Sequence, residues 1–299
     1  HGFKIYLGDT TNSLNLSNEN LSNALTILKY KNSLVLIHAE DQNCLRKYKR
    51  IEYNPSDHNT ARPSKCELKS IEYILSIAKK INTSIHICHV SSSESIKKLN
   101  KRPNNVSYGI TPHHSLLNYS MDNDSISWLK VNPPLRSKND QKQLFETVRA
   151  GDVSLIESDH APHTSIEKEK DFADAPCGIP GVETMFPLYL GLAEKKQISF
   201  ERIIKLICEH PSQLIKIPKG FISIGYDADI IAVNRKNIQK LTNEHLHSSC
   251  KCSPFENFPV IFPSSTFIRG QEVVKNGEIQ VSPGFGELIP QQRAELTTK

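Results

Sequence analysis

Histidine and acidic side chains follow several apolar runs of the sequence at the points where those runs end. Polar clusters of this kind occupy residues 38–41, 86–91, 111–114 and 158–164. In a parallel α/β barrel the carboxyl ends of all strands face one mouth, where the loops build the active site. Neutral imidazole and carboxylate groups are ligands that zinc accepts. The recurrence of these groups at successive strand ends therefore predicts a metal centre.

Single members of these clusters also have ordinary structural explanations. A lone histidine at a strand end is often only hydrogen-bonded, Asp159 could cap the segment that follows it, and Lys4 could be a solvated residue of an edge strand. An ammonium group cannot bind a metal. A buried lysine that loses its proton can react with carbon dioxide, however, and the resulting carbamate could bridge two cations. The recurrence of the clusters favours the metal centre over these alternatives.

Short apolar runs that alternate with helix-like stretches predict the elements that position these clusters. Five runs have the length and the Ile, Val or Tyr content of strands: residues 3–7, 34–37, 84–88, 105–111 and 153–158. Near-helical spacing of apolar residues predicts helices at residues 64–80, 141–150 and 187–195. This alternation is typical of βαβ units and predicts an α/β fold with a parallel sheet or barrel.

The pattern of the sequence changes near residue 218. From there the chain has the pattern of short strands separated by turns, with an Asn-Gly turn at Asn276 and Gly277. We therefore expect two parts, an α/β part at residues 1–217 and a small β part at residues 218–299.

The composition of the chain excludes several classes of protein. The 299 residues carry 37 Lys and Arg against 32 Asp and Glu, and this charge of +5 is too small and too scattered to favour nucleic-acid binding. No apolar run approaches the ~18 residues that span a membrane, and the chain opens on a strand-like run, not on a signal peptide. Seven cysteines without a CxxC pair indicate free thiols in a reducing, cytoplasmic compartment.

The polar clusters belong to longer motifs that resemble the dihydroorotases of the amidohydrolase superfamily. The motifs occupy residues 88–91, 110–114, 130–136, 158–164 and 175–184, and weaker ones occupy residues 225–230 and 253–256. The resemblance runs in order from residue 1 to about residue 287. It implies a TIM-like (β/α)8 metallo-dependent hydrolase barrel, with strands four to eight in this chain. It also implies a small C-terminal β-sandwich segment whose N-terminal half is missing.

Carried over position by position, the resemblance implies a centre of two zinc ions. Lys4 matches the carbamylated lysine, or carboxylysine, that bridges the two ions, although some dihydroorotases have an aspartate there. His38 and His89 match the histidines that hold the second ion. Asp159 matches the aspartate that binds the first ion and is the catalytic residue that shuttles the proton.

Further positions match residues that hold the substrate in the family. Asn132, His163, Cys177 and Gly178 have this role by resemblance, and Thr10 resembles a threonine of a substrate-covering loop in some members. One part of the family pattern is not in the chain. The family's first strand carries His-x-His followed by Arg, which completes the first metal site and binds the substrate carboxylate. We therefore expect this chain by itself to have little or no activity.

The reaction that the resemblance implies is the zinc-dependent, reversible cyclisation of N-carbamoyl-L-aspartate to L-dihydroorotate, a step of de novo pyrimidine biosynthesis. A hydantoinase or an allantoinase is one alternative, but these enzymes resemble His-x-Pro followed by Cys or Phe where this chain has His163. A second alternative is a non-catalytic, dihydroorotase-like scaffold of an aspartate transcarbamoylase, which usually loses metal ligands that are kept here. A small-molecule substrate is expected, and a homodimer or a transcarbamoylase partner is compatible with the resemblance. No nucleic-acid or membrane partner is expected.

Overall fold

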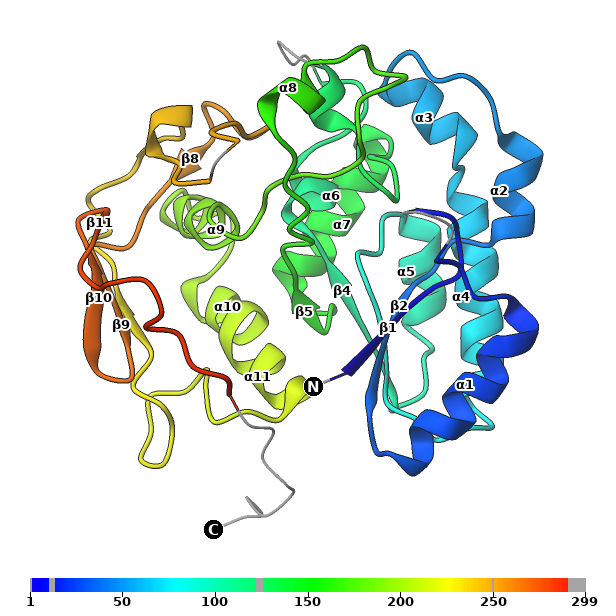
Figure 1. Ribbon diagram of the computed structural model, residues 1–299, viewed down its shortest axis with the longest axis horizontal. Helices are drawn as coiled ribbons and strands as arrows, with labels where there is room; N and C mark the ends of the chain where they lie inside the picture. The colour runs from blue at the N-terminus through cyan, green and yellow to red at the C-terminus, as the bar shows by residue number, and fades with distance from the viewer. Residues whose placement is uncertain (1, 11–13, 122–125, 249, 290–299) are drawn as a thin grey trace. The chain divides into compact units, whose positions relative to one another are not determined.

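Five parallel strands form one sheet in the computed structural model, which describes residues 2–10, 14–121, 126–248 and 250–289 (Figure 1). Each strand pairs with the next one along the chain, so the order is β1-β2-β3-β4-β5. The strands are β1 (Gly2–Tyr6), β2 (Leu34–His38), β3 (Ile85–Ile87), β4 (Val106–Ile110) and β5 (Leu155–Ile156). All five overlap the strands predicted from the apolar runs, which confirms the α/β fold class with a parallel sheet.

Helices follow each strand, and α1, α4 and α5 lie together beside the sheet in Figure 1. None of the helices in the described ranges is long and apolar enough to cross a membrane. The helices are α1 (Asn18–Tyr30), α2 (Gln42–Tyr48), α3 (Pro55–Ala61), α4 (Ser64–Ala78), α5 (Ser93–Leu99), α6 (Pro112–Leu116), α7 (Lys138–Ala150) and α8 (Ser165–Lys168). Two 3-10 turns are η1 (Ile126–Leu129) and η3 (Asn243–His245).

The predicted helices form for identifiable local reasons. In α4 the side chains of Ile71, Ile74 and Ala78 recur at helical spacing on one face, and all three are buried. The hydroxyl of Ser137 caps the start of α7 by accepting a hydrogen bond from the Asp140 amide. That helix ends at Gly151, whose φ of 82° is the left-handed conformation of a helix C-cap.

The register of the sheet brings the carboxyl ends of its strands level with one another. Tyr6 lies opposite His38, Ile37 lies opposite Ile87, and Ile110 lies opposite Ile156. Most residues of β2 and β3 are buried, as expected for parallel strands that are covered on both faces. The loops that carry the predicted polar clusters therefore start at the same edge of the sheet.

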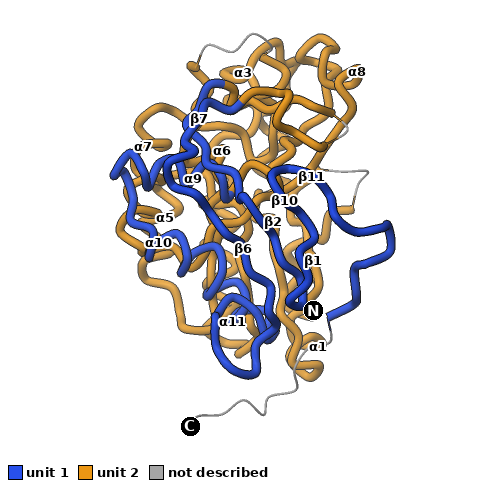
Figure 2. Tube along the Cα trace, turned by 90° about the vertical axis from the view of Figure 1, so that its left-hand side faces the viewer, with its two compact units in different colours: residues 1, 186–241, 257–299 blue, residues 2–185, 242–256 orange. Residues whose placement is uncertain are grey.

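The chain divides into two compact units, which Figure 2 shows in different colours. Unit 2 comprises residues 2–185 and 242–256 and contains the parallel sheet. Unit 1 comprises residue 1 with residues 186–241 and 257–299. Its helical elements are α9 (Met185–Glu194), which begins at the last residue of unit 2, α10 (Phe200–Ile204), the π-helical segment η2 (Lys205–Glu209) and α11 (His210–Ile215).

The strands of unit 1 are antiparallel. Its sheets have the orders β11-β10-β9-β6 and β7-β8. The strands are β6 (Ile230–Ala232), β7 (Gln239–Lys240), β8 (Pro259–Val260), β9 (Ser265–Ile268), β10 (Gln271–Lys275) and β11 (Glu278–Ile279). The predicted turn at Asn276 and Gly277 joins β10 to β11, and both residues have positive φ, 48° and 86°, as the hairpin turn requires.

One expectation about the cysteines is wrong. Cys44 in α2 and Cys66 in α4 form a disulfide, whereas the sequence indicated free thiols throughout. The two Cα atoms lie 5.4 Å apart, within the range that a disulfide spans. Because 22 positions separate the two residues and no motif marks them, only the packing of α2 on α4 reveals the pair. The other five cysteines are free.

Candidate metal centre

Two of the predicted ligands, His38 and His89, face each other. His38 is the last residue of β2, and His89 follows β3 by two residues with a φ of 43°. The Nδ1 atom of His38 lies 3.2 Å from the Nε2 atom of His89, and both side chains are buried. Burial lowers the pKa of both imidazoles because it disfavours their charged form. The structure therefore holds two neutral imidazoles, the form that binds a metal.

A carboxylate fixes the orientation of His38. Glu40 Oε2 lies 2.8 Å from His38 Nε2, and Arg62 Nη2 donates to the same oxygen at 2.5 Å. Burial opposes ionisation of Glu40, but Arg62 and His38 outweigh it and hold the pKa of Glu40 well below its usual range. The ionised Glu40 accepts the Nε2 proton and leaves the Nδ1 lone pair of His38 directed toward His89. Metal-binding histidines are oriented by carboxylates in this way.

Lys4 lies on the same side of the sheet as His38. It pairs with Leu36 in the middle of β1, and residues two apart on a strand share one face. Its Nζ atom lies 5.4 Å from the centre of the Tyr6 ring, which is 5.9 Å from the ring of His38. The Lys4 charge lowers the pKa of both His38 and His89, so the ammonium lies near both rings.

Asp159 completes the predicted set of ligands. It follows β5 by three residues and has a φ of 43°, an uncommon conformation for a residue with a side chain. Burial and then the nearby charge of Glu157 raise its pKa to about 6, although Lys4 acts in the opposite direction. Desolvation lowers the pKa of Lys4, but Cys88, Glu157 and Asp159 outweigh it and hold that pKa above its ordinary value. The other three predicted ligands therefore lie within electrostatic reach of the Lys4 ammonium group.

Sequence reasoning missed Glu157. Its Oε1 atom accepts a hydrogen bond from the His89 amide at 2.5 Å, and its Oε2 atom lies 3.5 Å from His86 Nε2. Among the described residues, one candidate donor atom from each of Glu157, His86 and Cys88 lies within 4.8 Å of the other two. A side chain at Gly109 would reach within 2.2 Å of Glu157 Oε1, so this glycine leaves the space for the carboxylate. The spacing of the sequence could have indicated it. Glu157 precedes Asp159 by two positions after one strand, and residues two apart in an extended chain lie on the same face.

Several predicted substrate positions lie close together. The Nε2 atom of His163 lies 3.2 Å from the carbonyl oxygen of Cys177. Gly178 has a φ of 153°, and a Cβ atom there would lie 2.4 Å from the Ala161 carbonyl and 3.0 Å from the His163 ring. Only glycine therefore fits at position 178 without a backbone shift. The Oδ1 atom of Asn132 is buried and has no hydrogen-bond partner among the described residues.

Thr10 lies at the end of the described segment that follows β1, and residues 11–13 lie outside the described ranges. Its neighbour Asp9 is hydrogen-bonded to the first residue of α2 and to the residue that caps the end of α3. The Asp9 amide donates to Gln42 Oε1 at 2.6 Å, and the Asp9 carbonyl accepts from Arg62 Nη2 at 3.1 Å. Arg62 thus connects the segment of Thr10 to Glu40.

The donor set fits a divalent metal ion. With its proton on Nε2 toward Glu40, His38 accepts a hydrogen bond at Nδ1 from the Nε2 atom of His89, and a metal ion would take the place of this hydrogen bond. The second ring nitrogen of His89 and the Nε2 atom of His86 are buried without a hydrogen-bond partner among the described residues. Unpaired buried polar atoms are costly unless a ligand satisfies them. Imidazole and carboxylate together are typical of zinc sites.

Comparisons with known proteins show which family and which proteins this chain is similar to. The family model described as Amidohydrolase family matches residues 10–273. The dihydroorotase of Thermoplasma volcanium is 38% identical over 290 residues, which cover 97% of this chain and 66% of the relative. The dihydroorotase of Thermoplasma acidophilum is 36% identical over 296 residues, which cover 98% of this chain and 67% of the relative. The chain spans about two thirds of the length of the curated relatives that it matches.

Solved structures share the fold. The L-hydantoinase (dihydropyrimidinase) from Arthrobacter aurescens has a TM-score of 0.89 at 25% identity, covering 96% of this chain and 68% of that one. The D-hydantoinase from a Thermus species has a TM-score of 0.87 at 20% identity, covering 96% and 67%. The chain belongs to the amidohydrolase family. The relatives at 36% and 38% identity bear the name dihydroorotase, which confirms the predicted resemblance.

Proposed function

We propose that this chain carries the catalytic centre of a zinc-dependent dihydroorotase, which interconverts L-dihydroorotate with water and N-carbamoyl-L-aspartate. Dihydroorotases of this family are metal-dependent enzymes. The observation that carries the proposal is the pair of neutral imidazoles, His38 and His89, whose ring nitrogens lie 3.2 Å apart. The charge of Lys4 acts on both of them and also on Asp159. A scaffold without catalysis has no need of this arrangement.

Four residues would hold two zinc ions. His38 and His89 would bind one ion, Asp159 would bind the other, and Lys4 would bridge them as a carbamate. Bound zinc lowers the pKa of an attacking water and polarises the carbonyl group of the substrate. Lys4 must lose its proton before it reacts with carbon dioxide. Its neighbours favour the ammonium form in the metal-free chain, so we expect carbamylation to accompany metal binding.

Asp159 would move the proton. Hydrolysis of a cyclic amide requires that the attacking water lose a proton and that the leaving nitrogen gain one. A carboxyl group whose pKa is about 6 is mainly ionised at neutral pH and is only weakly basic, so one oxygen can accept the proton and later return it. The backbone conformation of Asp159 holds this carboxylate at the strand end.

Three residues would orient the substrate. The buried Oδ1 atom of Asn132 is an unpaired acceptor that suits an N–H group of the dihydroorotate ring. His163 is held through Nε2 by the Cys177 carbonyl, and we expect the opposite edge of its ring to face the substrate carboxylate. Gly178 lets the backbone approach His163 closely. Such contacts reduce the entropy lost in reaching the transition state.

Hydantoinase activity is the second candidate, because hydantoinases share the fold. The two activities differ in the substrate carboxylate, which dihydroorotate has and hydantoin and dihydrouracil lack. Steady-state kinetics with L-dihydroorotate, dihydrouracil and hydantoin tests the proposal, in protein that contains this chain together with the family's His-x-His-Arg strand. We expect dihydroorotate to have the highest kcat/KM. The variant His163→Ala should lower kcat/KM for dihydroorotate about 100-fold and change that for dihydrouracil much less. Faster turnover of hydantoin or dihydrouracil than of dihydroorotate would contradict the proposal.

A further inference from the structure

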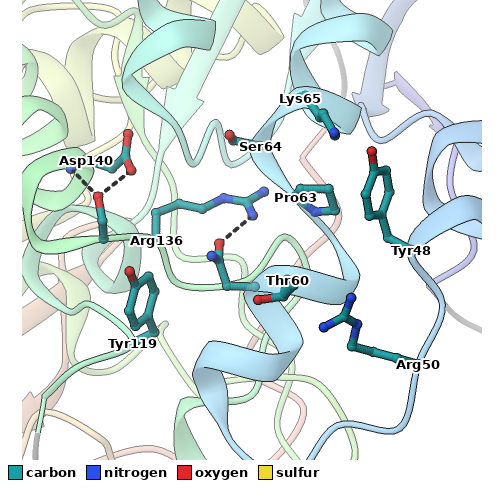
Figure 3. A pocket seen from close by; sticks show the side chains of 11 residues that line it. Tyr48, Arg50, Thr60, Pro63, Ser64, Lys65, Tyr119, Arg136 and Asp140 are labelled. Atoms are coloured by element: carbon teal, nitrogen blue, oxygen red, sulfur yellow. Dashed lines mark hydrogen bonds between the residues drawn. The ribbon is translucent and has the colours of Figure 1, made fainter.

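Unit 2 contains a cavity of about 350 Å³ that none of the predicted metal or substrate residues lines. Its walls come from four stretches of the chain: the end of α2 with the residues after it, the end of α3 with the start of α4, Tyr119 after α6, and the start of α7 (Figure 3). The charged residues of the wall are Arg50, Lys65 and Arg136, with Asp140 as the acidic one. Small-molecule sites have volumes of this order. The excess of positive charge indicates an anionic ligand.

Arg136 has an incomplete set of hydrogen bonds although it is only 3% exposed. Its Nε atom donates to Ser91 Oγ at 2.9 Å, and its Nη1 atom donates to Asn59 Oδ1 at 2.9 Å and to the Arg62 carbonyl at 2.6 Å. Its Nη2 atom is buried and has no partner among the described residues. An unpaired charged donor is costly to bury, and an anion in the cavity would satisfy it.

Asp140 does not serve as the partner of this guanidinium. Its Oδ1 atom accepts hydrogen bonds from the amide and the hydroxyl of Ser93, at 3.1 and 2.7 Å. Its Oδ2 atom accepts from the Ser137 hydroxyl at 2.6 Å. Both carboxylate oxygens are therefore engaged by other groups. The charges of Glu67, Glu40 and Asp140 act on Arg136, but its Nη2 donor has no hydrogen-bond partner among the described residues and remains available to a ligand.

The start of α4 adds a second anion-binding feature. This helix has 15 residues, and its N-cap residue is Pro63, which provides no side-chain hydrogen bond to the first turn. Pro63, Ser64 and Lys65 all line the cavity. Free amide groups and the helix dipole at such an N-terminus attract anions. Figure 3 shows the guanidinium group of Arg136 extending toward Ser64 and Pro63.

Aromatic side chains lie at the two sides of the cavity. Tyr48 and Tyr119 both line it, and Figure 3 shows them on opposite sides of Arg136. The Nζ atom of Lys65 lies 4.3 Å from the centre of the Tyr48 ring. Tyrosine faces favour flat rings, and guanidinium groups favour the paired oxygens of phosphate. The wall thus combines a cationic part with an aromatic part.

We propose that this cavity binds a small phosphorylated ligand that also carries an aromatic ring. The phosphoryl group is held by Arg136 and the start of α4, with Arg50 and Lys65 at the rim, and the ring packs on a tyrosine. Arg136 also contacts Ser91, near His89, and the backbone of Arg62, whose side chain binds Glu40. An occupied cavity is therefore connected to residues around the metal centre.

Calorimetric titration of the protein with phenyl phosphate tests this site without using enzymatic activity. We expect saturable binding that weakens with salt, and tighter binding of phenyl phosphate than of inorganic phosphate. The double variant Arg50→Gln with Lys65→Gln should weaken the binding about tenfold or more. Both side chains are exposed, so the fold should tolerate the change. The matched control is Lys29→Gln with Lys97→Gln, which alters exposed lysines away from the cavity and should leave the affinity unchanged.

Two results would overturn the inference. One is the absence of phenyl phosphate binding up to about 10 mM, and the other is equal affinity in the Arg50/Lys65 double variant and the control. Equal affinity for phenyl phosphate and inorganic phosphate would overturn the inference that the ligand carries an aromatic ring. The variant Arg136→Gln removes the central cation and should abolish binding of phenyl phosphate. Because Arg136 is buried, the circular dichroism spectrum of this variant is compared with that of the unaltered protein, and the two should be the same.

Discussion

Burial and neighbouring charges together set the charge of the individual groups at the candidate metal centre. It keeps His38 and His89 neutral and, together with Glu157, raises the pKa of Asp159 to about 6. Lys4 keeps its proton because Cys88, Glu157 and Asp159 outweigh its desolvation. The metal-free chain therefore combines neutral imidazoles, carboxyl groups and the nearby Lys4 ammonium. A divalent cation would satisfy the same groups more completely.

The raised pKa of Asp159 predicts how pH affects the stability of the metal-free protein. The folded protein holds the proton of Asp159 more tightly than the unfolded chain, because the folded pKa of about 6 exceeds the ordinary value of 3.8. Relative to high pH, protonated Asp159 therefore stabilises the fold fully below about pH 4, and this stabilisation is lost as the pH rises through 6. Asp159→Asn removes the cost of ionisation. We expect the variant to be more stable than the unaltered protein at pH 8, by at most about 3 kcal/mol, and equally stable at pH 4.

Urea unfolding of chelator-treated protein at the two pH values measures this difference. Asp174→Asn is the control, because this aspartate is exposed and its replacement should have no effect at either pH. A stability change of Asp159→Asn that is the same at pH 4 and pH 8 would show that ionisation of Asp159 does not destabilise the fold.

Glu40 should set the metal affinity of His38. Its carboxylate orients the imidazole and fixes the proton on Nε2, so Glu40→Gln should lower zinc affinity about 10- to 100-fold. Competition with a zinc-sensitive dye measures the affinity. Glu72→Gln is a matched control, because Glu72 forms only an exposed ion pair with Lys98. Unchanged zinc affinity in Glu40→Gln would remove Glu40 from the centre.

At the scale of elements, the parallel register does most of the positioning. The ends of β1 to β5 lie level, so residues from distant parts of the sequence reach one edge of the sheet. Sequence periodicity could predict these strands and the polar residues after them. It could not predict Glu157 as a partner of His89, because that contact depends on the space left by Gly109 on the neighbouring strand.

The disulfide between α2 and α4 should stabilise unit 2. A disulfide that closes a loop over 22 positions stabilises a protein by about 3 kcal/mol, because it restricts the unfolded chain. We expect the double variant Cys44→Ser with Cys66→Ser to lose about this much free energy of unfolding in urea. Cys208→Ser, which removes a free thiol, is the control.

A thiol titration of the denatured, unreduced protein checks the pairing directly. The structure predicts five reactive thiols out of seven cysteines. Seven reactive thiols would show that Cys44 and Cys66 are not joined in the purified protein, and the stability difference should then vanish as well.

At the scale of the whole molecule, the sequence predicted the α/β class, and the motifs predicted the family. The sequence could not predict which distant segments lie together in the fold. Residues 242–256 join unit 2 although the segments on both sides belong to unit 1, and β6 pairs with β9 about 35 residues later. Local hydrophobic patterns identify elements, but they do not select partners in space. The cavity around Arg136 could not be predicted for the same reason, because its walls come from four separate segments of the chain.

The central claim is that a metal centre at His38, His89, Lys4 and Asp159 supports dihydroorotate hydrolysis. Because this chain by itself is expected to have little activity, the most direct measurement uses the chain together with the family's His-x-His-Arg strand. It compares L-dihydroorotate turnover in this protein when zinc-loaded, when stripped by a chelator and when zinc is returned to the stripped sample. We expect turnover in the first sample, a loss of at least about 100-fold in the second, and recovery in the third. Undiminished turnover after verified removal of the metal, or no turnover in the zinc-loaded protein, would contradict this claim.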